Sequence, residues 1–518
     1  MNTDFKKSIL PFAVSVLLAV GLFVTHIMGK SNDDFFSIPK VSVLQEIKTI
    51  IAKRYLEAVN ADTLTATTID SVLMNLDPHS RYITPSEKQT ELEGIKGMFY
   101  GIGVEYTLIN DSVNVVQVLD KSPAQEAGLQ VGDIILKAGD SSVSGASITA
   151  QRIKLILTGE RGSKILIIVK RAEKILQLSA QRKEVDVNSV DASFIISPGI
   201  GYIKLNRFTT KTYREFMTAL MSLKKQPLNK LILDLRDNGG GVLEEAVEIA
   251  DEFLEGDKLI SYTQGFHSPK KQYRCRRLGQ FEEGKLLILS NENSASASEI
   301  LMGALQDWDR ATIVGKRSFG KGLLQEQYNL NDGGALRLTI AKYYTPLGRS
   351  IQRNYTAGKQ AYYDGAKSQL SDTNVRDKRQ LTLTKSGKKL FDQSGISPDV
   401  LVESDSAIIS LNLLSILNDD ASKNFGYRYH VRNKTIKTQY GNFEVFQKTM
   451  TVDDKIWNFY KQSLSAKNLI LLSQLSSKDK EILGRHLKTS LAAQLYGRQG
   501  YYRSLALTDQ AIKKAVAL

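Results

Sequence analysis

The chain has 518 residues, of which 42% are hydrophobic and 24% are charged. This length exceeds one ordinary hydrophobic core, and the composition is that of a folded rather than a disordered protein, so we expect several domains. The net charge is +14, but the basic residues are spread along the chain and no nucleic-acid-binding module is recognisable. We therefore interpret the charge as a basic solvated surface and expect no nucleic-acid partner.

Residues 1–30 contain a candidate membrane segment. Lys6 and Lys7 precede a nearly uninterrupted apolar stretch of twenty residues from Ile9 to Met28, and a helix of that length rises about 30 Å, enough to cross the hydrocarbon core. The stretch does not end in a small-x-small cleavage site. We predict an uncleaved signal anchor with its lysines in the cytoplasm; a cleaved signal peptide is the alternative.

The cysteine and histidine content excludes two kinds of site. Cys275 is the single cysteine, so no internal disulfide can form. The five histidines are far apart and have neither HxxxH nor HxH spacing. We therefore predict no metal site.

Residues 31–94 form a predicted N-terminal helical region. Apolar residues recur every three or four positions from Val43 to Tyr55, which indicates a helix. A second helix is predicted over 68–76. It should end at Asp77, because the residue before a proline resists the α conformation.

Two changes of pattern follow. Residues 95–178 carry short β-branched runs at 103–106, 113–118, 133–136 and 165–169 around a short helix at 122–129, which predicts a small β-rich module. In residues 179–402, apolar strand-like runs alternate with helix-like runs, which indicates an α/β layered domain. The predicted strands are 202–205, 230–235, 285–289 and 312–314, and the predicted helices are 213–223, 243–254 and 298–308.

The polar region 355–380 is predicted to be a loop, and residues 403–518 a helical C-terminal extension. Within the extension, helices are predicted over 408–417, 455–463 and 479–496. The extension most simply serves packing or dimerisation.

A serine-rich turn lies at the end of one predicted strand. Residues 286–289 are apolar, the next residues are small, and a helix then begins, with Ser294, Ser296 and Ser298 around its start. A hydroxyl at a helix N-terminus faces free N–H groups that favour developing negative charge. The alternative is that these serines only cap the helix.

A candidate base follows the serines in the sequence. Lys321 stands between two glycines, which allow close backbone approach, so its side chain could point inward. Burial lowers the pKa of an amine and can make it a neutral base. Gln325, four residues on, could hold the amine by a hydrogen bond.

These residues resemble a known family. Ser-Ala-Ser-Ala-Ser-Glu at 294–299, Gln-Asp at 306–307, Gly-Lys-Gly at 320–322 and Gln325 are similar to the catalytic core of carboxy-terminal processing proteases, also called tail-specific proteases. The resemblance implies that Ser296 is the nucleophile, Lys321 the general base and Gln325 the residue that orients it. It assigns Asp307 a supporting role.

The resemblance extends over about residues 40–402. Residues 233–241 are similar to the family's L-D-L-R-x-N-P-G-G segment, with Gly239 in place of the usual proline. Further family-like segments occur at 76–82, 343–352 and 395–400. The resemblance implies an oxyanion hole formed by the Gly240 and Ala297 N–H groups. It also implies a multidomain α+β protein with a crotonase-like α/β protease core.

The β-rich module resembles a PDZ domain. Its peptide-binding loop corresponds to Phe99, Tyr100, Gly101, Ile102 and Gly103, and such loops hold a terminal carboxylate while the peptide adds as a β-strand. A structural β-subdomain with an empty groove is the alternative. The family often has an arginine before the glycine aligned with Gly159, where this chain has Thr158. If that arginine couples peptide docking on the PDZ domain to activation of the protease, this coupling is altered here or uses Arg161.

We therefore expect an envelope serine endopeptidase that cleaves near protein C-termini without a metal or an organic cofactor. Its partners would be proteins or peptides with accessible C-termini and the bacterial inner membrane, crossed once, with the catalytic part in the periplasm; a homodimer is compatible with the family. One rival is an inactive PDZ scaffold on a degenerate protease fold. Another is a Ser–His esterase or amidase, which would need the G-x-S-x-G elbow that the chain lacks.

Overall fold

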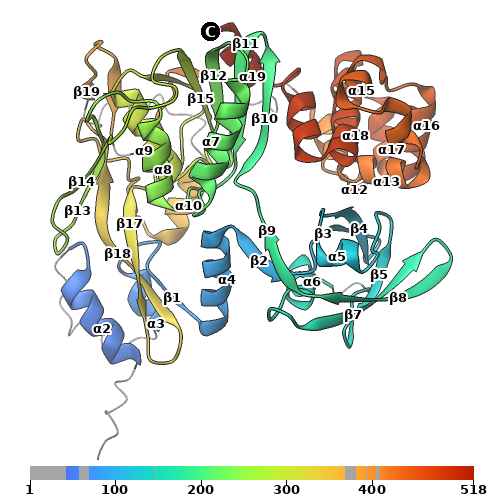
Figure 1. Ribbon diagram of the computed structural model, residues 1–518, viewed down its shortest axis with the longest axis horizontal. Coiled ribbons are helices and arrows are strands. Elements are labelled where there is room, and N and C mark those ends of the chain that lie inside the picture. The colour runs from blue at the N-terminus through green and yellow to red at the C-terminus, as the bar shows by residue number, and fades with distance from the viewer. Residues whose placement is uncertain (1–42, 58–68, 146–147, 368–380, 393, 404–408) are drawn as a thin grey trace, which may run out of the picture.

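The computed structural model describes residues 43–57, 69–145, 148–367, 381–392, 394–403 and 409–518. They form N-terminal helices, a β-rich module, a larger α/β domain and a helical C-terminal region, so the predicted multidomain α+β class is confirmed (Figure 1). The predicted signal anchor lies outside the described residues. Within those ranges, no helix is both long and apolar enough to cross a membrane.

A six-stranded sheet forms the centre of the α/β domain. Neighbouring strands of this sheet run parallel, except for the first two, which are antiparallel. The middle strands read as continuous apolar runs because both of their faces are covered. In spatial order the strands are β10 (Val190–Ser197), β11 (Gly199–Leu205), β12 (Leu228–Asp234), β15 (Lys285–Ser290), β16 (Ala311–Gly315) and β21 (Val400–Leu401).

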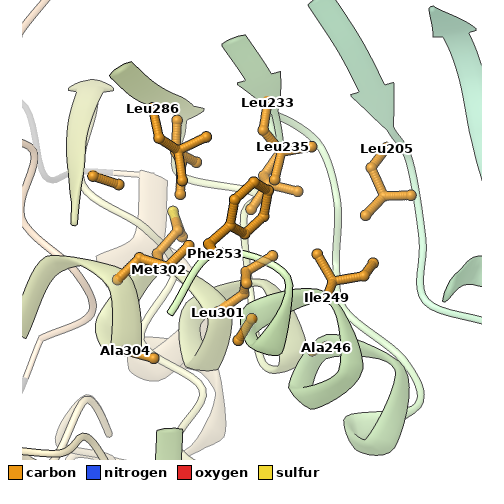
Figure 2. Packing of buried hydrophobic residues seen from close by; sticks show 14 of the residues in the cluster. Leu205, Leu233, Leu235, Ala246, Ile249, Phe253, Leu286, Leu301, Met302 and Ala304 are labelled. Atoms are coloured by element: carbon orange, nitrogen blue, oxygen red, sulfur yellow. The ribbon is translucent and has the colours of Figure 1, made fainter. Parts of the chain in front are cut away.

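Three helices cover one face of this sheet. They are α7 (Thr212–Leu223), α8 (Leu243–Asp251) and α9 (Ala297–Asp307), all close to their predicted ranges. Figure 2 shows the resulting core, in which Leu233 and Leu286 of the sheet face Ile249, Phe253 and Leu301. Packing α8 and α9 on this face also fixes the turns that lead into these helices.

The other face of the sheet is covered by the last helix of the chain. Ala511, Ile512 and Ala515 of α19 (Gln510–Ala517) pack on Ile232 of β12 and Leu287 of β15. The end of the C-terminal extension is thus a layer of the α/β domain (Figure 1). The sequence interpretation did not anticipate this role.

A second sheet lies beside the first. The hairpin of β17 (Leu323–Asn329) and β18 (Ala335–Tyr344) carries β1 (Arg81–Ile83) and the pair β13 (Leu259–Gln264) and β14 (Lys271–Arg274). The N-terminal helices α2 (Val43–Arg54) and α3 (Ile69–Met74) match the two predicted helices. Ile47, Ile51 and Leu73 of these helices share one core with Leu336 and Leu338 of β18.

A two-stranded ribbon connects the β-rich module to the α/β domain. In this ribbon β2 (Met98–Gly101), which follows α4 (Pro85–Lys96), pairs with β9 (Lys183–Asp186). The module's sheet has the order β3 (Val104–Ile109), β4 (Ser112–Val118), β5 (Ile134–Ala138), β7 (Lys164–Arg171) and β8 (Lys174–Gln181), with β6 (Ser141–Ser142) beside β5. Its helices are α5 (Pro123–Glu126) and α6 (Ala150–Leu157).

The C-terminal helices pack beside this module. Asn424 contacts Thr107 of β3 at 2.8 Å, and Gln494 donates to the Val116 carbonyl of β4 at 2.8 Å. The helices are α11 (Leu411–Leu417), α12 (Asp420–Lys423), α13 (Phe425–Arg432), α14 (Ile436–Tyr440), α15 (Phe443–Thr449), α16 (Asp454–Ser463), α17 (Ala466–Ser473) and α18 (Ser477–Leu505).

The loop predicted over 355–380 is wrong for part of its length. Residues Lys359–Lys367 form α10, and Tyr362 within it is 1% exposed. Because the segment is polar overall, its sequence did not indicate that Tyr362 packs inward. Residues 368–380 lie outside the described residues. After them, β19 (Leu381–Leu383) and β20 (Lys389–Phe391) form a small hairpin.

Candidate active site

Three serines surround the start of α9, and only one is accessible. Ser294 and Ser298 are fully buried, and their hydroxyls donate to the carbonyls of Leu235 and Asn238, each at 2.9 Å. Ser296 is partly exposed and has φ +56° and ψ −115°. That conformation is strained for a residue with a side chain, and such strain gathers at functional sites.

A buried carboxylate ties Ser296 to the predicted base. Glu299 is 0% exposed, and its Oε2 accepts from the backbone N–H groups of Ser296 and Lys321, each at 2.8 Å. Its Oε1 accepts from Ser318 Oγ at 2.6 Å and from Gly320 N–H at 2.7 Å. Four donors therefore hold one carboxylate between the turn at residues 294–296, here called the serine turn, and the loop at residues 318–322, here called the lysine loop.

Lys321 lies in the loop that leads into β17, and its side chain is partly buried. Burial lowers the pKa of its amine below the ordinary 10.5, and the positive charge of Arg337 acts in the same direction. Glu299 and Asp77 oppose this shift. A lysine with a lowered pKa is neutral over a wider pH range, as a general base requires.

Gln325 follows on β17, in register with Thr339 of β18. Its Nε2 is buried and has no hydrogen-bond partner among the described residues. A buried amide donor without an acceptor is costly. A neutral amine can accept a hydrogen bond, so this donor fits the predicted role of orienting Lys321.

The two predicted oxyanion donors lie next to each other. A methyl group built on Gly240 would be 2.8 Å from Ala297 N and 2.7 Å from Ala295 O. Ala297 is the first residue of α9, so its N–H has no acceptor within the helix. The Gly240 N–H donates to Asn238 Oδ1 at 2.9 Å. It could serve an oxyanion only by sharing that bond or by breaking it.

Asp307 lies at the other end of α9 from Ser296, about 16 Å away at the helical rise of 1.5 Å per residue. It forms a fully buried ion pair with Arg349 and accepts from the Leu347 N–H at 2.9 Å. Its role in this conformation is to hold the turn before Arg349. It supports the fold of the domain rather than the lysine.

The predicted peptide-binding loop consists of the last three residues of β2 and the two residues before β3. Phe99, Tyr100 and Gly101 belong to β2, and the carbonyls of Ile102 and Gly103 accept from Ala124 and Leu119 at 2.8 and 3.1 Å. These bonds anchor the loop from its inner side. Within the described residues β3 pairs only with β4, so its other edge is available for strand addition.

An arginine that the sequence interpretation did not consider lies at the end of α6. Thr158 caps that helix, donating to the Lys154 carbonyl at 2.7 Å. Arg161 is exposed. Arg182 instead donates to the Ile156 carbonyl at 2.8 Å and lies against Gly159.

Sequence reasoning also missed the part that residues 76–82 and Tyr362 play near the lysine loop. His79 Nε2 lies 3.0 Å from Tyr362 Oη, which donates to the Gly320 carbonyl at 3.4 Å. Burial lowers the pKa of His79 to about 3, and the charges of Lys321 and Lys359 act in the same direction. No periodicity could have indicated this contact, because the partners are 283 residues apart.

Comparison with known proteins places this chain in a family. Residues 199–360 match the model of peptidase family S41, and residues 101–181 match that of the PDZ domain. A carboxy-terminal-processing protease of Bartonella bacilliformis is 34% identical over 353 residues, which cover 67% of this chain and 80% of that relative. The chain belongs to this family of carboxy-terminal processing proteases. It is a serine peptidase with a PDZ domain.

Two further proteins are similar to this chain. A Staphylococcus epidermidis protein described as a CtpA-like serine protease is 32% identical over 60% of this chain and 62% of its own length. The solved structure of a photosystem II D1 C-terminal processing protease is 24% identical and covers 70% of this chain and 93% of that chain, with a TM-score of 0.41. Membership of a peptidase family favours an enzyme over the inactive scaffold.

Proposed function

We propose that this peptidase cleaves peptide bonds near protein C-termini with a Ser296–Lys321 dyad. The observation that carries the proposal is the Glu299 carboxylate, which binds the backbone of both residues through a single oxygen. Four hydrogen bonds to one buried carboxylate fix two loops that lie 25 positions apart in the sequence. Nucleophilic catalysis needs such fixed geometry between nucleophile and base.

In the proposed reaction, neutral Lys321 takes the proton of Ser296 as the hydroxyl oxygen attacks the scissile carbonyl. The Ala297 N–H, and the Gly240 N–H if it turns from Asn238, stabilise the oxyanion. The Lys321 ammonium then protonates the leaving amine. In the second half, Lys321 takes a proton from water as the water oxygen attacks the acyl-enzyme carbonyl. The Lys321 ammonium then gives this proton to Ser296 Oγ as the ester C–O bond breaks, which restores the hydroxyl and the neutral amine.

We also propose that the PDZ domain holds the substrate's tail. The extended end of a flexible protein would add along the free edge of β3, with its terminal carboxylate at residues 99–103. The preceding segment would then be fed to Ser296. Anchorage of the chain to the bacterial inner membrane through residues 1–30, with the peptidase in the periplasm, is part of the same proposal.

Cleavage of an unfolded, casein-like protein by three matched forms tests the dyad. The wild type is expected to degrade it, whereas Ser296→Ala and Lys321→Ala should each retain less than about 1% of kcat. Ser294→Ala is the control, because Ser294 is buried and its hydroxyl donates to a carbonyl. Full activity in either dyad variant would refute the proposal.

A further inference from the structure

The C-terminal helix α19 makes a charged contact with the loop that follows β12. Asp509, the N-cap of α19, accepts from Arg236 Nη1 at 2.7 Å through its Oδ2. Its Oδ1 accepts from the Ile512 N–H at 2.8 Å and so caps the helix. One side chain therefore both starts the helix and holds Arg236.

Arg236 is fixed on every side. Its Nη2 and Nε bind the carboxylate of Asp234 at 2.6 and 3.0 Å, and its own N–H donates to Asp234 Oδ1 at 3.0 Å. Its carbonyl accepts from Lys204 Nζ. The side chains of Arg236, Asp234 and Asp509 are 18%, 1% and 12% exposed, so these charged bonds are little weakened by water.

The loop runs from Arg236 directly to the reaction centre. Asn238, two residues on, is fully buried and receives the Gly240 N–H on its Oδ1. Its carbonyl accepts from the Ala295 N–H at 3.0 Å, beside Ser296. A displacement of Arg236 would therefore move Asn238 and Gly240 against the serine turn.

We propose that Asp509 is a positioning residue for the loop that holds Asn238 and Gly240 against the serine turn, beside the Ala297 N–H. The last helix of the C-terminal extension is then part of the support of the catalytic centre, and not only a packing or dimerisation element. This inference rests on the proposed Ser296–Lys321 reaction. Its physical basis is that donors to an oxyanion act only when they are held within a fraction of an ångström of their working position.

Asp509→Asn separates the two jobs of Asp509. Asparagine caps a helix as well as aspartate does, so α19 should stay docked while the ion pair to Arg236 is lost. We expect kcat on the casein-like protein to fall about tenfold with KM unchanged. Asp509→Glu, which restores the charge, should recover part of kcat.

Lys230→Met is the matched control. Lys230 Nζ donates to the Val516 carbonyl at 2.7 Å, so it binds the opposite end of α19 without touching the loop. It should lower Tm by as much as Asp509→Asn or more, yet leave kcat unchanged. Wild-type kcat in Asp509→Asn, or an equal loss of kcat in Lys230→Met, would overturn the inference.

Ser296→Ala in the same assay keeps the two ideas apart. If Ser296→Ala is inactive and Asp509→Asn has wild-type kcat, the dyad stands and the role of Asp509 falls. If Ser296→Ala still cleaves, the proposed reaction falls, and the positioning role falls with it.

Discussion

The backbone N–H groups of Ser296 and Lys321 donate to the same oxygen of Glu299, Oε2, each at a distance of 2.8 Å. Glu299→Gln should therefore disturb both residues at once, because an amide offers one acceptor oxygen and turns N–H donors toward other donors. We expect kcat to fall by roughly 10- to 100-fold and the free energy of unfolding by about 3 kcal/mol. Peptidase assays and urea unfolding measure the two effects, and wild-type values in both would contradict this role.

Gly240 and Gly239 form a matched pair for the glycine loop. Gly240 has φ +92°, and a methyl group there would lie 2.7–2.8 Å from backbone atoms of the serine turn. Gly240→Ala should lower kcat by about 100-fold, the loss typical of removing an oxyanion donor. Nothing lies within 4 Å of a methyl group at Gly239, so Gly239→Ala should keep near-wild-type kcat. Equal activity of the two variants would show that the approach of Gly240 to Ser296 is unimportant.

The charge of Asp77 contributes to the pKa of Lys321, in opposition to the effect of burial. Lys321 must be neutral to accept a proton, so kcat/KM should rise as pH rises through its pKa. Burial lowers this pKa and Asp77 opposes the shift. Asp77→Asn removes the negative charge, so the pKa should fall further and the rising limb should move to lower pH.

The control for this shift is Ser80→Ala. Ser80 donates to the Asp77 carboxylate from both its N–H and its hydroxyl, so the variant disturbs the same contacts without changing a charge. The rising limb of the kcat/KM profile of Ser80→Ala should stay at the wild-type pH. A shift of the Asp77→Asn limb to higher pH would contradict the assigned electrostatics.

The peptide-binding loop can be tested by a second glycine pair. Gly103 has φ +77° and a methyl group there would be 2.4 Å from Ser122 Cβ, whereas Gly128 has φ +83° and open space. Gly103→Ala should weaken binding of a tail peptide to the PDZ domain at least tenfold, since strain and clash act together. Gly128→Ala carries the strain alone and should bind within about threefold of wild type. Fluorescence anisotropy with a labelled peptide measures the affinity of both variants. Unchanged binding by Gly103→Ala would show that this loop does not form part of the peptide-binding groove.

Local patterns predicted the elements better than their assembly. The apolar runs of β12 and β15 and the periodic helices α7 and α9 carry their own signals, and the structure has them close to the predicted bounds. The polar sequence of α10 gave no such signal, although Tyr362 within it is buried. The packing of α19 on Ile232 could not be predicted either, because the sequence of a short amphipathic helix does not indicate which surface its apolar face covers.

For the site, the family motif indicated Ser296, Lys321 and Gln325, and the geometry added the Glu299 carboxylate that links the first two. Glu299 was visible as the last residue of a Ser-x-x-Glu capping pattern, yet its bonds to Gly320 and Lys321 depend on tertiary contact. The Asp509–Arg236 pair spans 273 positions. No spacing rule reaches that far.

Direct titration of the Lys321 amine tests whether this amine is the base for Ser296. Nitrogen-15 NMR of labelled lysine side chains, with the signal assigned by its loss in Lys321→Arg, gives the pKa in the folded enzyme. We expect a midpoint below the ordinary 10.5 that coincides with the midpoint of the kcat/KM profile. A midpoint at the ordinary value, together with undiminished cleavage by Lys321→Arg, would contradict a neutral lysine as the base for Ser296.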